Sequence, residues 1–171
     1  MAAFDMSKAT PAQRETIEEI HKDRSIAAGQ AVSPLWSSMI ASAGATRRIA
    51  KLGAHCRFDS ALSEAHREIA ILGAVHPIGF AMEIKVHEEI ATRLGFPASV
   101  LAAIREGRFD AVPQDIRSIA QLTNAVASGK GDTAAPLAAV RAQLGEQAAV
   151  DAVTTAGYYV MLYRVSQALK G

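Results

Sequence analysis

Helix start and stop signals recur along the chain and divide it into segments of helical length. Thr10-Pro11-Ala12-Gln13 combines an N-cap threonine, a proline at the first helical position and a glutamine three residues after the cap. Gly95 and Pro97 give a glycine exit followed by a proline restart. No segment has a strong strand-like alternation of polar and apolar residues. The sequence therefore predicts an all-α protein, folded as a compact helical bundle.

The predicted helices lie between these signals, where apolar residues recur at helical spacing. We expect them at about 10–28, 34–42, 46–56, 63–76, 79–94, 97–106, 113–128, 135–144 and 147–169. Pro77 and Gly79 predict a break between the fourth and fifth. With 171 residues, 50% of them hydrophobic, the chain can bury one sizeable core and is too short to suggest two. We therefore expect a single domain over 1–171.

Charge and cysteine content limit the classes of function. The formal charge is +1, from 18 basic and 17 acidic residues, so no global field favours nucleic acid or an anionic membrane. The sequence has neither a secretory signal at its N-terminus nor an apolar run long enough to span a bilayer. We expect a soluble, cytoplasmic protein. A single cysteine, Cys56, rules out an intramolecular disulfide and a thiolate-rich zinc site.

The last predicted helix contains a segment, 157–163, that is apolar almost all round. A surface helix of a monomer could not tolerate such a segment well. The segment is therefore either central core or a subunit interface.

Three ionisable residues fall on helix faces that should be buried. At about 100° per residue, Glu83, His87 and Leu94 lie on one stripe of the 79–94 helix. Glu68 lies on the apolar stripe of the preceding helix. The i,i+4 spacing lets Glu83 contact His87, and a carboxylate beside an imidazole orients it and favours its protonated form. Glu68 needs a partner when buried, and the facing helix offers His87.

The pattern thus predicts an acid/base site made of Glu68, Glu83 and His87, with two alternatives. The same residues could form a purely structural polar network. They also have the ligand types of a metal site, although no second histidine stands at helical spacing in either segment. Neither a metal nor a cofactor is part of the expected site.

Three motifs, in this order and spacing, resemble the carboxymuconolactone decarboxylase and alkylhydroperoxidase-D-like superfamily. They are Arg67-Glu68-Ile69-Ala70-Ile71-Leu72, Glu83-x-x-x-His87 and Ala91-x-x-Leu94-Gly95. The resemblance covers about 34–107, and 157–165 are similar to the C-terminal helix of longer members. It implies a helical bundle of the alkylhydroperoxidase-D type, assembled as a homo-oligomer, either a trimer or a hexamer.

The resemblance also implies roles for the site residues. In the peroxidase branch, the glutamate and histidine positions fall on Glu68 and His87, and the C-x-x-C cysteines fall on Phe80 and Glu83. Neither of those two residues can attack a peroxide, so the dithiol mechanism is lost. The decarboxylase branch carries a glutamate four residues before the histidine, as here. It implies that His87 is the general acid/base, Glu83 its orienting partner and Glu68 a second relay carboxylate.

We therefore expect a cofactor-free lyase that acts on a small carboxylated lactone or oxo acid. One alternative is a peroxidase that uses Cys56 with an external thiol. Another is a non-catalytic oligomeric binding protein that keeps the family fold. Met82-Glu83-Ile84 stands where many longer members carry Tyr-Glu-Trp, which should alter the pocket wall and leaves the substrate open.

Overall fold

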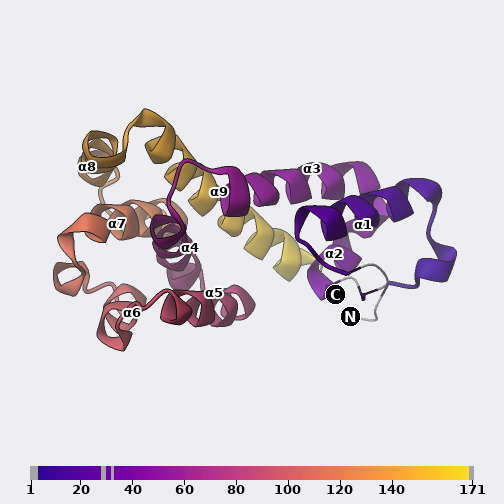
Figure 1. The fold of residues 1–171 in the computed structure, drawn as a ribbon, viewed down its shortest axis with the longest axis horizontal. Coiled ribbons are helices and arrows are strands. Elements are labelled where there is room, and N and C mark those ends of the chain that lie inside the picture. Colours follow the sequence, from indigo (N-terminus) through magenta and orange to yellow (C-terminus); the bar gives the residue numbers. More distant parts are fainter. Residues whose placement is uncertain (1–3, 28–29, 32, 170–171) are drawn as a thin grey trace. The chain divides into compact units, whose positions relative to one another are not determined.

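The computed structural model describes residues 4–27, 30–31 and 33–169, and these residues form helices and connecting loops without a strand (Figure 1). The prediction of an all-α protein is confirmed for this part of the chain. The helices are α1 (Pro11–Asp23), α2 (Pro34–Met39), α3 (Ala43–Ala54), α4 (Glu64–Ile78), α5 (Ala81–Arg93), α6 (Ala98–Arg105), α7 (Gln114–Ser128), α8 (Ala134–Leu144) and α9 (Glu146–Ala168). The shorter helical turns are η1 (Met6–Lys8), η2 (Ile40–Ser42), η3 (His55–Asp59) and η4 (Phe109–Ala111). None of the described helices has the length and apolar character needed to cross a membrane.

The residues group into two compact units by their contacts. Asp59–Tyr163 form unit 2, and the segments before Asp59 and after Tyr163 form unit 1. The last residues of α9 therefore belong to unit 1 and the rest of that helix to unit 2. A single folding domain stays a prediction.

Unit 1 is built on α1 and α3, which pack against each other. The predicted capping box is present at the start of α1: the Gln13 backbone N–H donates to the Thr10 hydroxyl, and the Gln13 side chain accepts from the Thr10 N–H at 2.8 Å. Ile17 and Ile20 of α1 are buried. Ion pairs lie along the edge of the α1–α3 contact, among them Lys51 Nζ to Asp23 Oδ2 at 2.9 Å.

The end predicted for the first helix, near Ala28, is wrong. Helix α1 ends at Asp23, because the N–H of Arg24 turns back to the carbonyls of His21 and Lys22, and Ser25 takes a positive φ of 52°. A residue with this left-handed backbone conformation cannot continue a right-handed helix. The conformation is unfavourable for most residues other than glycine and asparagine. The expected exit through Ala28 and Gly29 lies outside the described residues.

Helix α4 is the central element of unit 2. It packs against α5, α6 and α7, and every residue from Glu68 to Val75 is buried. Gly73 allows the close approach of α7, since a Cβ at this position would lie 2.3 Å from Thr123 Oγ1. A helix that is buried on all sides has apolar residues all round and not only along one stripe. The sequence of α4 is therefore almost continuously hydrophobic.

The predicted break between the fourth and fifth helices is present, but it lies at Gly79 and Phe80 and not at Pro77. The helix continues through this proline to Ile78 and ends at Gly79, whose φ of 68° is left-handed. A proline in the last turn removes only one backbone hydrogen bond, and the glycine supplies the exit. The result is a short connection from α4 to α5, which places the two helices beside each other and sets up the site.

Candidate functional site

His87 lies at the centre of a buried polar cluster in unit 2. Its ring is completely buried. Nδ1 lies 2.6 Å from Oε2 of Glu68, whose side chain is only 5% exposed. An ionised carboxylate can only accept, so the Nδ1–H of His87 donates to Glu68. This bond fixes the tautomer of a neutral ring and leaves Nε2 as the basic nitrogen.

Two groups meet at the other nitrogen. The hydroxyl of Tyr159 lies 3.0 Å from Nε2, and Oε2 of Glu83 lies 3.4 Å from the same atom. With a neutral ring, Tyr159 donates its O–H to Nε2. With a protonated ring, Nε2–H becomes a donor that Glu83 or the Tyr159 oxygen can accept. The tyrosine ring also packs edge-on against the imidazole, with ring centroids 5.6 Å apart.

Three helices supply this cluster. Glu68 comes from the buried part of α4, Glu83 and His87 come from α5, and Tyr159 comes from α9. Glu83 lies in the first turn of α5, where the helix dipole favours a negative charge. One turn later, the same face of α5 carries His87 into the interior.

The cluster has one end near the surface. The side chain of Glu83 is 14% exposed, whereas that of His87 is fully buried. A proton that reaches Nε2 can therefore pass through the Glu83 carboxylate to solvent. The arrangement can store a proton, move it between Nε2 and Glu83, and hold the imidazole in one orientation.

The structure brings Glu68, Glu83 and His87 together, as the sequence predicted. The predicted stripe on α5 is not complete, because Leu94 is 38% exposed rather than inward-facing. Glu68 and Glu83 contact opposite nitrogens of the ring, so the three side chains do not converge on one point. Within the described residues, no group of three or more His, Cys, Asp or Glu side chains has an arrangement that could hold a metal ion.

Tyr159 is the site residue that sequence reasoning missed. The sequence leaves the segment around it as either core or interface, and in the structure Tyr158, Tyr159 and Leu162 are buried, while Gly157 is exposed. A tyrosine in an apolar helix carries a hydroxyl that must find a partner when buried. That requirement was the available signal, although it does not identify His87 as the partner.

A second histidine, His76, belongs to a separate charged group. Its Nε2 lies 3.3 Å from Oε1 of Glu88, outside hydrogen-bond geometry, and Glu88 also accepts from Arg105 at 2.6 Å. Burial lowers the pKa of His76 below its ordinary value of 6.5, the Glu88 charge opposes that shift and the Arg105 charge adds to it. His76 lies in the last turn of α4, and no role in the His87 cluster follows from its position.

Cys56 lies in unit 1, in the turn η3, and is 1% exposed. A peroxide would have to reach a buried sulfur before the thiol could react.

Comparison of the chain with protein families, with curated proteins and with solved structures finds no match. The resemblance stated above therefore stays a prediction from the motifs.

Proposed function

We propose that unit 2 is a cofactor-free lyase that uses His87 as a general acid/base on a small carboxylated lactone or related oxo acid. The observation that carries the proposal is the environment of His87 Nε2. The Tyr159 hydroxyl and the Glu83 carboxylate lie within 3.4 Å of this nitrogen, and the bond from Nδ1 to Glu68 holds the ring in one orientation. Such an environment suits an imidazole that gains and loses a proton during each turnover.

The proposed decarboxylation requires a proton donor after the carbon–carbon bond has broken. Loss of carbon dioxide from a carboxylated unsaturated lactone breaks a carbon–carbon bond and leaves the electron pair in a dienolate. A proton must then be delivered to carbon, and an imidazolium at His87 can supply it. Tyr159 and Glu83 would return the ring to its starting state, because Glu83 connects Nε2 to solvent.

The geometry favours an exchange of the roles that the resemblance implies for the two carboxylates. Glu68 bonds Nδ1 at 2.6 Å from a buried position, so it is the group suited to orienting the imidazole. Glu83 is the more exposed of the two and faces Nε2, so it is the group suited to passing protons and meeting substrate. We therefore assign orientation to Glu68 and proton transfer to Glu83.

The test is His87→Gln, assayed with a panel of carboxylated lactones. Loss of an acid/base group should lower kcat by on the order of a hundredfold, with little change in substrate binding. His66→Gln is the matched control, because this histidine lies on α4 in the same unit and is only half-buried. Unchanged kcat in a folded His87→Gln variant would end the acid/base proposal.

The complete burial of the His87 ring supports a second candidate, a structural network in a non-catalytic binding protein. This candidate predicts that His87→Gln and Glu68→Gln each lower the melting temperature and leave any ligand affinity intact. Glu83→Gln separates the two candidates further. In the lyase it should change the pH dependence of kcat, whereas in a structural network it should have only a small effect on stability, because the side chain is partly exposed.

A further inference from the structure

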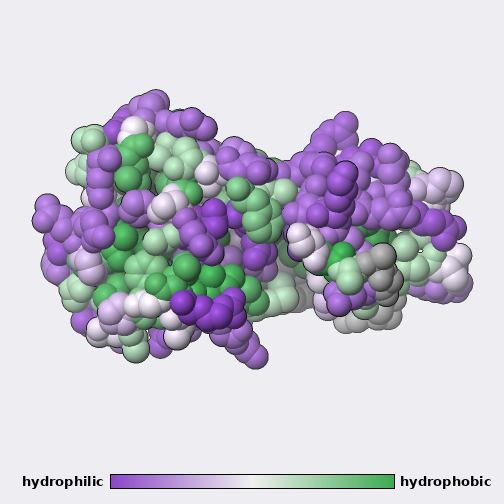
Figure 2. Space-filling view, viewed as in Figure 1, coloured by the Kyte–Doolittle hydropathy of each residue, from purple (hydrophilic) through white to green (hydrophobic). Residues whose placement is uncertain are grey.

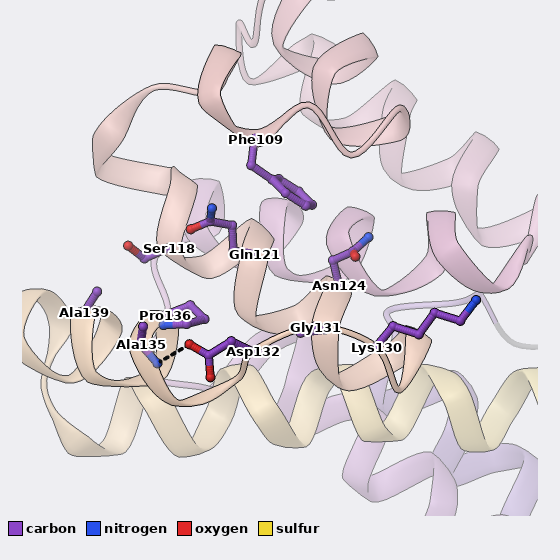
Figure 3. A pocket seen from close by; sticks show the side chains of 11 residues that line it. Phe109, Ser118, Gln121, Asn124, Lys130, Gly131, Asp132, Ala135, Pro136 and Ala139 are labelled. Atoms are coloured by element: carbon purple, nitrogen blue, oxygen red, sulfur yellow. Dashed lines mark hydrogen bonds between the residues drawn. The ribbon is translucent and has the colours of Figure 1, made fainter.

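Unit 2 contains a cavity that is separate from the His87 cluster and is built from η4, α7, the loop after α7 and α8. Its volume is about 470 Å³, which falls within the range of small-molecule sites. Residues from all four segments line it, including Phe109, Gln121, Asn124, Lys130 and Pro136. The close-up in Figure 3 shows these side chains. The residues of the His87 cluster are not among its walls.

Two carboxamides on α7 face this cavity. Gln121 and Asn124 are three residues apart, which places them on the same side of the helix, and both are half-buried. Within the described part of the chain, neither carboxamide has a hydrogen-bond partner in the protein. Each therefore offers a free donor and a free acceptor, the combination that pairs with the edge of a nitrogen heterocycle.

An aromatic ring and a charge complete the lining. In Figure 3 the ring of Phe109 extends from η4 toward α7, between Gln121 and Asn124, and Lys130 lies on the loop beyond Asn124. The carboxylate of Asp132 already accepts from the backbone N–H groups of Ala134 and Ala135, at 2.8 and 3.1 Å. That carboxylate caps α8 and, among the described residues, makes no ion pair with Lys130, so the ammonium is available to an anion.

We propose that this cavity binds a planar nitrogen heterocycle that carries one anionic group, a ligand of the size of a purine mononucleotide. Phe109 provides a face for stacking, and base–aromatic stacking tolerates many rings. The carboxamides of Gln121 and Asn124 bond the edge of the ring, and Lys130 neutralises the anionic group. A bare anion would leave both the ring and the two carboxamides unused.

The experiment is an NMR titration of the full-length protein with AMP, adenosine and inorganic phosphate. AMP should give saturable shifts at the amides of residues around Phe109 and Asn124. Adenosine should bind more weakly at the same place, and phosphate should not bind there at millimolar concentration. AMP shifts that are absent, or that map elsewhere, would overturn the proposal.

Three variants assign the contacts. Asn124→Leu should weaken binding of both AMP and adenosine by about tenfold, the effect of roughly one lost hydrogen bond to a ligand. Lys130→Met should weaken AMP by about two- to fivefold and leave adenosine unchanged, as expected for an exposed charge pair. Lys85→Met is the control, an exposed lysine on α5 outside this cavity. Equal losses of AMP affinity in Lys85→Met and Lys130→Met would show nonspecific attraction and refute the site.

Discussion

A single phenolic hydroxyl connects an apolar segment of α9 to the buried polar cluster around His87. Tyr159 is 1% exposed, and its partner His87 lies 72 residues earlier in the sequence. Removing the hydroxyl leaves Nε2 with one donor fewer in a place that water does not reach easily. The cost of such a loss is about 1–3 kcal/mol when the group left behind has no other partner.

We expect Tyr159→Phe to destabilise unit 2 by about 1–2 kcal/mol, because the substitution keeps the ring and deletes one hydrogen bond. The measurement is thermal unfolding followed by far-UV circular dichroism. A double-mutant cycle with Glu83→Gln tests whether both residues act on Nε2, in which case their effects should not add. Additive effects would mean that Tyr159 and Glu83 act independently.

His76 gives a prediction for pH dependence. Its folded pKa is lowered below 6.5, chiefly by burial, so the unfolded chain binds the proton more readily than the folded one. The free energy of unfolding is therefore highest above the ordinary pKa of 6.5 and falls as the pH drops through that value toward the folded pKa. His76→Gln should reduce this fall. Chemical unfolding at a series of pH values checks it, with His66→Gln as the control on the same helix.

At the scale of the elements, two helical glycines test how closely the helices pack. A Cβ on Gly73 would meet Thr123 Oγ1 at 2.3 Å and the Ala120 carbonyl oxygen at 3.0 Å, whereas a Cβ on Gly157 would meet nothing within 4 Å. Gly73→Ala should cost about 1–3 kcal/mol by pushing α4 and α7 apart. Gly157→Ala should stabilise the protein by about 0.5–1 kcal/mol by favouring the helix.

Both glycine variants are measured by denaturant unfolding. In Gly73→Ala, adding Thr123→Ala should recover part of the loss, because it removes the nearest clashing atom. A destabilising Gly157→Ala would instead indicate that another molecule packs against α9 at this residue, because within the chain the added Cβ meets no atom within 4 Å.

Local signals were enough to predict most of the helix boundaries. The Thr10 capping box and the left-handed glycines at 79, 95, 129 and 145 act within a few residues, so the sequence alone reveals where most helices begin or end. The failures have a different cause. The end of α1 depends on the backbone of Ser25, a residue with no strong preference for positive φ, and the passage of α4 through Pro77 depends on how little a proline costs in a last turn.

Local periodicity also predicted part of the His87 cluster. Glu83 and His87 are one turn apart, so periodicity alone brings them together, and Glu68 lies on the next helix along the chain. Tyr159 joins them only through the packing of α9 in unit 2, which no local pattern encodes. The exposure of Leu94 shows the same limit. Periodicity predicts which face of a helix is apolar, but it does not predict how far along the helix a neighbouring element covers that face.

At the scale of the whole molecule, we still expect a homo-oligomer, although the structure changes the reason. Tyr158, Tyr159 and Leu162 are buried within the chain, so they do not need a partner subunit. Exposed apolar residues remain on α5, where Met82 is 45% and Val86 39% exposed. In the view of Figure 2, hydrophobic surface gathers over the part of unit 2 that contains α5.

Light scattering at micromolar concentrations tests this expectation. The wild type should have a mass above that of one chain, and Met82→Glu with Val86→Glu should shift it toward the monomer, because a charge on each side opposes burial of the face. Val150→Glu is the control, an exposed apolar residue on α9 of the same unit. A strictly monomeric wild type would defeat the prediction.

The separation of the chain into two units decides which spectroscopic probe reports on which half. The only tryptophan, Trp36, and the only cysteine, Cys56, both belong to unit 1, where the Arg24 guanidinium lies 4.9 Å from the centre of the indole ring. Indole fluorescence and thiol labelling therefore follow the opening of unit 1. The His87 cluster and the cavity beside α7 and α8 lie in unit 2, whose aromatic reporters are tyrosines and phenylalanines. An unfolding curve from fluorescence that differs from one by circular dichroism would measure directly whether the two units melt together.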